Sequence, residues 1–484
     1  MGVGQPRPDG DAAPRSHPGE PGIGLDLPPP FAAPDPDTRW LFALNRFGIR
    51  PGLQRIEGLL KDLGHPERGL RVLVVAGTNG KGSTTRVLAH LLEAAGLATA
   101  TYTSPHLLAV HERIRLHDRN VDPDDFARRV RAIRPLVLKH DASWFEALTA
   151  VMVQIARDAG ADVVCCEAGL GGRLDASNAL PAEAVLLTTV GLDHQHILGE
   201  TRPQILAEKL GLLKRGVPLY CGVDAELRGQ VFTTAVGAGA PVLFLDELAR
   251  WEDGPGPWDL VLRERVLAGL PDPGTPVLRR NVALALLALG DLEARGHGPL
   301  LPADPASALG NLFLPGRYQR VLTAPDWIFD TAHNPQALAA ALDAFVARPV
   351  AGRRVLVYGA MQDKPADPAL APLVGACDRV IGLPVSLPRS CTPAELEARL
   401  RGWSLAPEPW PPAAGARAAV GPTAAAALAE AARGLEPGDA VLVTGSCFSV
   451  AEALWLLGVR DLDETRTARP AGPALAALVA GAAG

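Results

Sequence analysis

The stretch Arg71-Val-Leu-Val-Val-Ala-Gly-Thr-Asn-Gly-Lys-Gly-Ser-Thr84 decides how this chain folds. Its first half is a short, continuous apolar run, which is typical of a strand buried on both faces of a parallel sheet. Its second half is rich in glycine, and residues 83–95 then carry apolar side chains at helical spacing. A buried strand, a glycine-rich turn and a helix in this order predict the first unit of a doubly wound α/β domain.

The glycine-rich turn from Gly77 to Thr84 has the chemistry of a phosphate-binding loop. Glycines let successive backbone amides face phosphate oxygens, and the following helix adds positive potential at its N-terminus. Lys81 is placed to meet the β- and γ-phosphates, and the hydroxyl of Ser83 or Thr84 to face Mg²⁺ or phosphate. The spacing is G-x-x-G-K-G-S, not G-x-x-x-x-G-K-[ST]. A plain turn with a solvated lysine is the alternative, but the preceding buried strand favours nucleotide binding.

Strands and helices continue to alternate along the chain. After the first unit, the pattern predicts strands at 98–102, 162–167, 184–189 and 218–221, and helices at 124–138, 144–159 and 202–213. A second block follows Leu314-Pro-Gly-Arg317, with strands at 327–330, 354–358, 379–382 and 440–444. Residues 254–257 and 271–276 are expected to be loops. The chain is therefore predicted to form an α/β domain followed by a smaller one.

Composition limits the classes of function. The 484 residues are 48% hydrophobic and 21% charged, as in an ordinary soluble protein, and the net charge of −6 argues against a wide basic surface for nucleic acid. The longest apolar run, residues 282–289, is far shorter than the ~18 residues of a membrane helix. No secretory signal opens the chain, and its six cysteines lack C-x-x-C spacing. Reduced thiols and a cytoplasmic location are expected, with no membrane partner.

The ends of the chain differ in composition from its middle. Residues 1–37 contain ten prolines and six glycines, which predicts a disordered N-terminal extension. The last residues, 463–484, are rich in Ala, Gly, Pro and Thr and are expected to form a flexible tail. Between them, we expect a nucleotide-binding domain at 38–314 and the smaller domain at 315–462.

Three polar residues mark the ends of predicted strands. Ser104 and His194 follow strands, and Glu167 ends one. Ligands collect at the carboxyl ends of strands in open α/β sheets, so these side chains are expected to converge near the phosphate loop. Oxygen donors with one imidazole suit Mg²⁺ or Mn²⁺. Each residue alone has a structural explanation, such as a carboxylate paired with an arginine; together they predict a metal site.

The loop Gly77-Thr-Asn-Gly-Lys-Gly-Ser83 resembles the ATP loop of the Mur ligase superfamily, and the motifs that follow resemble its folylpolyglutamate synthase and dihydrofolate synthase branch. The resemblance runs from about Trp40 to Leu457. It implies a P-loop ATPase domain with a mostly parallel sheet, then a smaller Rossmann-like glutamate ligase domain. It also implies an ATP-dependent ligase that adds L-glutamate to dihydropteroate, to the γ-carboxylate of tetrahydrofolate, or to both, through an acyl phosphate.

The resemblance carries roles onto matching residues. ATP-binding residues are expected to be Thr78, Asn79, Gly80, Lys81, Gly82, Ser83, Thr84, Asn281, Arg317 and Asp330. It implies that Ser104, Glu167 and His194 hold Mg²⁺ or Mn²⁺, that K⁺ is a further cation, and that CO₂ converts Lys209 to an anionic carbamate. The catalytic residues are then Lys81, His194, Lys209 and Arg317. Structural alternatives are a helix cap for Asn281, a linker arginine for Arg317, and a helix lysine paired with Glu208 for Lys209.

Other motifs are similar to substrate-binding segments of the family. Folate-binding residues are expected to be Ser143, Trp144, Phe145, Glu146, Leu174, Asp175 and Ala176, and glutamate-binding residues His333 and Ser446. Residues 45–52 should border the folate pocket, although they form a shorter loop than is usual. Lys364, in Met361-Gln-Asp-Lys364, is expected near the cleft. Core packing for the aromatic pair and a helix cap for Asp175 are the structural alternatives.

Rival functions fit the sequence less well. A Mur-type UDP-muramoyl amino-acid ligase would need a further domain before the phosphate loop, and the roughly 40 ordered residues there are too few. A P-loop GTPase would need a guanine-specificity motif, and a binding module would not need so complete a site. We therefore expect small-molecule substrates (ATP, L-glutamate, and dihydropteroate or tetrahydrofolate) and a monomer.

Overall fold

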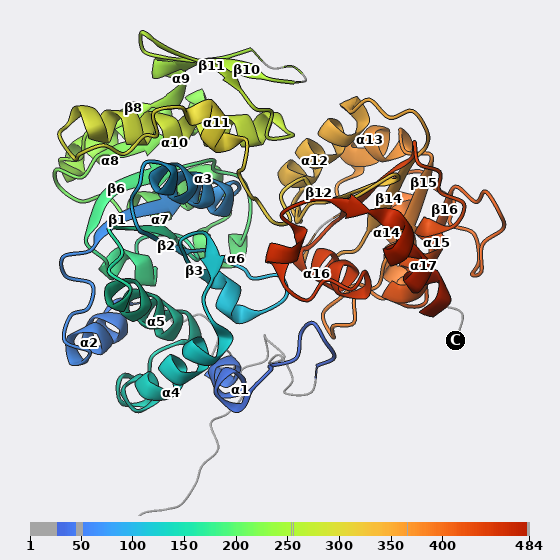
Figure 1. The fold of residues 1–484 in the computed structure, drawn as a ribbon, viewed down its shortest axis with the longest axis horizontal. Coiled ribbons are helices and arrows are strands. Elements are labelled where there is room, and N and C mark those ends of the chain that lie inside the picture. Colours follow the sequence, from blue (N-terminus) through green and yellow to red (C-terminus); the bar gives the residue numbers. More distant parts are fainter. Residues whose placement is uncertain (1–26, 45–51, 253, 255, 365, 482–484) are drawn as a thin grey trace, which may run out of the picture.

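The computed structural model describes residues 27–44, 52–252, 254, 256–364 and 366–481. They form two α/β domains, each built on a mostly parallel sheet, which confirms the predicted fold class. In Figure 1 the first domain runs from blue to yellow, and the second, from orange to red, lies beside it.

The first domain is built on an eight-stranded sheet. Its strand order is β4-β3-β2-β5-β1-β6-β7-β8, and β3 pairs antiparallel with both β2 and β4, whereas the other neighbours are parallel. The strands are β1 Arg71–Ala76, β2 Thr99–Tyr102, β3 Ile114–Leu116, β4 Arg119–Asn120, β5 Val163–Glu167, β6 Ala182–Leu187, β7 Leu219–Cys221 and β8 Val242–Phe244. The helices are α1 Pro36–Ala43, α2 Gln54–Asp62, α3 Lys81–Ala94, α4 Pro123–His140, α5 Trp144–Asp158, α6 Gln195–Leu198, α7 Arg202–Leu210, α8 Arg228–Ala238, α9 Leu245–Leu248, α10 Pro276–Ala294 and α11 Pro305–Leu309.

Strand β1 is apolar along its length because both of its faces are buried. It lies between β5 and β6, and its side chains alternate between the two faces. Val72, Val74 and Ala76 belong to the core under α4, α5 and α7, whereas Leu73 and Val75 belong to the core under α3 and α10. Helices therefore cover both faces, and the carboxyl end of β1 is left to carry the phosphate loop.

A small antiparallel sheet was not foreseen. It has the order β11-β10-β9, from β9 Ala249–Arg250, β10 Trp258–Leu262 and β11 Arg265–Leu270. It projects from the first domain beside α9 (Figure 1). Several of its side chains are exposed, so its strands lack the continuous apolar run by which the other strands were recognised.

The second domain is built on a seven-stranded sheet with the order β16-β15-β14-β17-β13-β12-β18. Its strands are β12 Gln319–Thr323, β13 Asp326–Phe329, β14 Arg354–Tyr358, β15 Arg379–Gly382, β16 Ala418–Val420, β17 Ala440–Thr444 and β18 Arg469–Pro470. Its helices are α12 Pro335–Ala347, α13 Ala371–Gly375, α14 Pro393–Gly402, α15 Ala424–Ala432, α16 Cys447–Leu456 and α17 Ala471–Gly481. Strands β12 and β13 form an antiparallel hairpin, and the other neighbours are parallel.

The structure describes parts of both predicted ends, residues 27–37 and 463–481. In the extension predicted at 1–37, the ring of Phe31 lies edge-on to Phe448, 5.9 Å between centroids, and Asp35 caps α1. In the tail predicted at 463–484, β18 pairs with β12, and α17 buries Leu478 in the core of the second domain. Composition reports local preference, whereas these segments are ordered by packing against distant apolar side chains. Residues 1–26 and 482–484 lie outside the described part.

Contacts between the domains surround the linker between α11 and β12. Leu108 of the first domain is buried in the core of the second. Arg115, on β3, donates to Asp463 at 2.9 Å, and Arg466 donates to Asp118 at 2.8 Å. These contacts hold the two sheets side by side with a cavity between them. No helix in the described part of the chain is long and apolar enough to span a membrane.

Candidate active site

The phosphate loop joins the end of β1 to the start of α3 at Lys81. Gly77 and Gly80 have φ angles of +149° and +86°, which side chains disfavour. A Cβ at Gly77 would overlap Thr188 Oγ1, and one at Gly80 would lie 2.6 Å from Asn281 Oδ1. Both glycines are therefore required by backbone conformation and by space, and the first turn of α3 faces the cavity.

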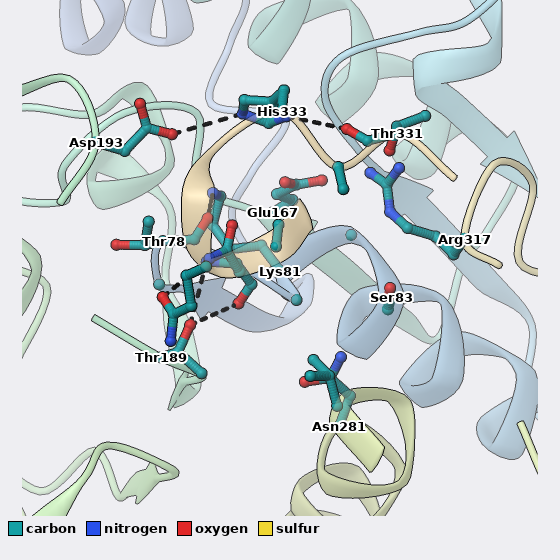
Figure 2. A pocket seen from close by; sticks show the side chains of 18 of the residues that line it. Thr78, Lys81, Ser83, Glu167, Thr189, Asp193, Asn281, Arg317, Thr331 and His333 are labelled. Carbon is teal, nitrogen blue, oxygen red and sulfur yellow. Dashed lines mark hydrogen bonds and ion pairs between the residues drawn. The ribbon is translucent and has the colours of Figure 1, made fainter. Parts of the chain in front are cut away.

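A cavity of about 260 Å³ lies between the two domains at this loop (Figure 2). Its wall combines the loop, the carboxyl ends of first-domain strands, the start of α10, and the edge of the second domain. The predicted residues on this wall are Thr78, Asn79, Gly80, Lys81, Gly82, Ser83, Ser104, Glu167, His194, Lys209, Asn281, Arg317, Asp330 and His333. Thr84 is the exception among the ATP residues, because it is buried behind the loop. The structure thus brings together residues from both domains.

Glu167 is a buried carboxylate beside the loop. Its Oε2 accepts the backbone N–H of Ser104 at 2.8 Å, and the same oxygen would lie 3.1 Å from a Cβ at Gly82. Burial raises the pKa of Glu167, while the nearby positive charges of Lys81 and Arg317 oppose that rise. A buried carboxylate at the phosphate-binding end of a cavity suits a hard divalent cation.

Lys209 is also buried beside the loop. Its Nζ donates to the carbonyl oxygen of Gly77 at 2.7 Å, and the residue is only 5% exposed. Burial lowers its pKa to about 7, and the charge of Lys81 acts in the same direction. Much of the Lys209 amine is therefore uncharged at neutral pH, so it can act as a nucleophile toward CO₂.

His194 begins α6 with a φ angle of +50°. Partial burial and the charges of Lys364 and Lys81 together lower its pKa to about 4 against the opposing effect of Asp193, so the imidazole is neutral and can bind a metal. Among the described residues, no three His, Cys, Asp or Glu side chains lie close enough to hold a metal by themselves. A cation here would also be coordinated by hydroxyl, carbamate, water or phosphate oxygens, as is usual for Mg²⁺.

Arg317 reaches the loop from the second domain. In the linker, Gly316 and Tyr318 have φ angles of +64° and +48°, and Arg317 lies between them. Its Nη2 would lie 3.8 Å from a Cβ at Gly82 (Figure 2). Asp330, at the end of β13, accepts the N–H groups of Tyr318 at 2.7 Å and Ala332 at 2.8 Å. Asp330 therefore shapes the turn that presents the Arg317 guanidinium.

The sequence reading missed Asp193, which joins the domains. Its carboxylate accepts from Lys364 Nζ at 2.7 Å and Asn334 Nδ2 at 3.3 Å, and lies 3.5 Å from His333 Nε2 (Figure 2). Burial alone would raise the pKa of Asp193, but hydrogen bonds from His333 and Lys364 outweigh it and hold the pKa well below its usual range. Lys364 therefore pairs with a first-domain carboxylate from the second domain, and its expected place near the cleft stays a prediction. Asp193 directly precedes His194, and that adjacency was the available signal.

The predicted substrate-binding residues away from the loop have structural partners. Ser143 and Glu146 form the capping box of α5, and Glu146 also pairs with Arg55 at 3.1 Å. Asp175 caps a short 3₁₀ helix, and Ser446 caps α16. The set that does not line the cavity comprises Ser143, Trp144, Phe145, Glu146, Leu174, Asp175, Ala176 and Ser446. Their substrate roles stay predictions. Of the predicted pocket border at 45–52, residues 45–51 lie outside the described residues.

Comparison with known proteins places this architecture among ligases. Residues 316–447 match the family model of the Mur ligase glutamate ligase domain. The dihydrofolate synthase/folylpolyglutamate synthase of Escherichia coli K12 is 30% identical over 436 residues, covering 88% of this chain and 97% of that protein. The Bacillus subtilis 168 enzyme of the same name is 30% identical over 364 residues, covering 69% and 81%.

Solved structures agree over the same span. E. coli FolC in complex with ADP matches with a TM-score of 0.77 at 30% identity, covering 88% of this chain and 98% of that one. A bifunctional folylpolyglutamate synthase/dihydrofolate synthase with Mn, AMPPNP and L-glutamate bound matches with a TM-score of 0.76 at 30% identity, covering 88% and 99%.

Proposed function

The chain belongs to the dihydrofolate synthase/folylpolyglutamate synthase family, and from this membership we propose that it carries out both glutamate ligations in the cavity between its domains. It is an ATP-dependent ligase that joins L-glutamate to dihydropteroate or to a folate γ-carboxylate. The observation that carries the assignment is the convergence of a phosphate loop from one domain and Arg317 from the other on one cavity. The substrates are small molecules, and we propose that the enzyme is a cytoplasmic monomer.

The chemistry needs positioning more than covalent catalysis. The acceptor carboxylate attacks the γ-phosphorus of ATP, forming an acyl phosphate and releasing ADP; the glutamate amine then attacks the acyl carbon, and inorganic phosphate leaves. The loop amides and Lys81 hold the phosphates, and the Arg317 guanidinium stabilises charge on the transferring group. The contacts of Asp193 with Lys364 and His333 close the domains and exclude water from the acyl phosphate.

A divalent metal ion fits the residues present. A relative's structure holds Mn with AMPPNP, and Glu167, Ser104 and neutral His194 offer the oxygen and nitrogen donors that Mg²⁺ or Mn²⁺ accepts. Such an ion supplies charge neutralisation at the phosphates when bound. We also propose that K⁺ binds as a further cation, and this proposal rests on the family resemblance alone.

Lys209 is proposed to act as a carbamate. Its uncharged amine attacks the carbon of CO₂, a C–N bond forms, and the ammonium proton is lost to solvent, which leaves an anionic carbamate. An anion at this position suits the buried space beside Gly77 and Lys81 better than a second cation does. Because the pKa of Lys209 is about 7, the reactive amine predominates above pH 7, and the carbamate is lost as the pH falls below it.

We expect Lys209→Ala to lower kcat by about 10- to 100-fold, because the carbamate positions the metal and the loop. Added acetate, which restores a carboxylate to the vacated space, should recover part of this activity. In wild-type protein equilibrated with ¹³CO₂, one carbamate carbon per chain should appear by NMR and vanish on acidification. A wild-type spectrum without that signal under turnover conditions would contradict carbamate formation.

The function itself is tested by assaying dihydropteroate and tetrahydrofolate side by side with ATP and L-glutamate. Steady-state ADP release is expected with either acceptor and only when glutamate is present, because without the amine the acyl phosphate is not consumed and turnover stops. A glutamylated product with one acceptor alone would restrict the enzyme to that reaction. ADP release with a UDP-muramoyl acceptor but with neither folate substrate would favour the Mur-type alternative.

A further inference from the structure

A small side chamber opens from the main cavity behind the first turn of α3. Its volume is about 40 Å³, and it shares part of its wall with the main cavity, including Ser83, Ser104 and Arg317. Its own wall adds Arg86, His106 and Cys447. We name it the Arg86 chamber, because Arg86 lines it and has no role in the site described above. It adjoins Gly82 and Ser83 of the phosphate loop.

Arg86 is a buried cation without an adequate partner. Its side chain is only 10% exposed, and among the described residues its Nη1 has no hydrogen-bond acceptor. The carboxylate that pairs with it, Asp118 Oδ1, lies 3.9 Å from Nη1, beyond hydrogen-bond distance. Burial lowers its pKa to about 9, so the guanidinium is still charged at neutral pH. A buried charge that lacks hydrogen bonds is costly unless a ligand supplies them.

The chamber wall carries two guanidinium groups and two carboxyl groups. Arg317 shares the wall, and His106 Nδ1 accepts from Arg113 Nε at 2.9 Å. The Glu112 carboxylate is occupied by the backbone N–H groups of residues 107–109, and burial raises its pKa to about 7. Glu167 also lines the chamber, but Ser104 N–H and the main-cavity cations engage it. The two carboxyl groups thus have other partners, whereas Arg86 Nη1 lacks an acceptor among the described residues, so Arg86 and Arg317 are the donors that a small oxyanion would meet here.

We propose that the Arg86 chamber binds an oxyanion of the reaction, through the Arg86 and Arg317 guanidinium groups and the Ser83 hydroxyl. This inference rests on the proposed function, which supplies two candidates: a carboxylate of the incoming glutamate, and the inorganic phosphate that leaves. Both present paired oxygens that match a guanidinium fork. The chamber, at about 40 Å³, is too small for a pterin, and its wall includes Gly82 and Ser83 of the phosphate loop, so an anion held by that loop has this recess beside it.

The test compares Arg86→Met and Arg86→Lys with a matched surface control, Arg128→Met, whose side chain is 69% exposed on α4. Calorimetry on the ADP-loaded protein measures the binding of L-glutamate and of inorganic phosphate separately. Steady-state kinetics measure KM for ATP, folate and glutamate, and inhibition by phosphate. The Arg86→Met variant loses charge-assisted hydrogen bonds, so its affinity for the anion should fall by about 10- to 100-fold. The Arg128→Met variant should match wild type.

Each outcome decides the proposal. A higher Kd and a higher KM for glutamate, with an unchanged KM for ATP, assign the chamber to the substrate carboxylate. A higher Kd for phosphate and weaker inhibition by phosphate, with an unchanged KM for glutamate, assign the chamber to the product. Constants within about twofold of wild type, or equal losses for every ligand with a lower Tm, overturn it. If Arg86→Met does not fold, Arg86→Lys, which keeps the charge without the fork, gives the same comparison. If wild type forms no glutamyl product, the proposed function fails, and the binding data still decide the chamber.

Discussion

Replacing Lys81 with alanine is expected to lower kcat by about 100- to 1,000-fold while the protein keeps its fold. The ammonium group is a charged donor aimed at the phosphates in a cavity that excludes water, where one such donor contributes most. Among the residues that the structure describes, its Nζ donates one hydrogen bond, to the carbonyl oxygen of Thr78 at 3.1 Å, so few contacts are lost. ADP release under saturating substrates measures the change, and thermal unfolding checks the fold.

Two variants control this experiment. Lys61→Ala, on the exposed face of α2, removes a lysine with no part in the cavity and should leave kcat unchanged. Lys81→Arg should stay impaired, because the larger guanidinium does not fit the loop, where an added Cβ at Gly80 already meets Asn281. Wild-type turnover in Lys81→Ala would show that this loop does not hold the reacting phosphates.

Replacing Arg317 with alanine is expected to lower kcat by about 1,000-fold or more and to leave the Kd for ADP nearly unchanged. The loop amides of the first domain bind the nucleotide, whereas Arg317 from the second domain meets charge that develops on the transferred phosphoryl group. Its only hydrogen bond among the described residues is to the carbonyl oxygen of Gly316 at 3.2 Å, so the guanidinium is available to a ligand. Single-turnover kinetics and ADP titration separate the two effects.

The control for Arg317 is Arg320→Ala, three residues along in β12, where the side chain is half exposed and 3.7 Å from Asp326. It should retain wild-type kcat, because it does not line the cavity. Arg317→Lys should recover only part of the activity, since an ammonium replaces the fork with a point charge. A loss of ADP affinity as large as the loss of kcat would contradict the assignment, because it would make Arg317 a ground-state binding residue.

Segments whose structure depends on local pattern were predicted well. The strands at 354–358, 379–382 and 440–444 coincide with β14, β15 and β17, because each is an apolar run buried on both faces. The antiparallel sheet β9-β10-β11 was missed, since its short, exposed strands carry no such run. Helix α17 was missed because its alanine- and glycine-rich composition predicts a flexible tail. Pairing with β12 and packing on the second-domain core order that tail.

The site divides in the same way. Site residues that are neighbours in the sequence could be predicted from the sequence alone. Gly77 and Gly80 have positive φ angles that favour glycine, and Lys81 follows them in the same short loop, whose conformation is local. Strand-end residues such as Glu167 could also be placed, since parallel strands end at one edge. Ser143 and Glu146 show the limit, because a capping box and a ligand site use the same residue types.

By itself, then, the sequence determined the fold class, the phosphate loop and which strand ends would carry polar groups, because backbone conformation and burial follow from residues close together in the chain. Only the tertiary structure decided that Asp193 pairs with Lys364 across the domains, that Asp330 shapes the turn of Arg317, and that Arg86 is buried beside a chamber without a hydrogen bond to its Nη1. Those features join residues far apart in the chain, and the distance and desolvation that give them their chemistry exist only once the two domains have packed together.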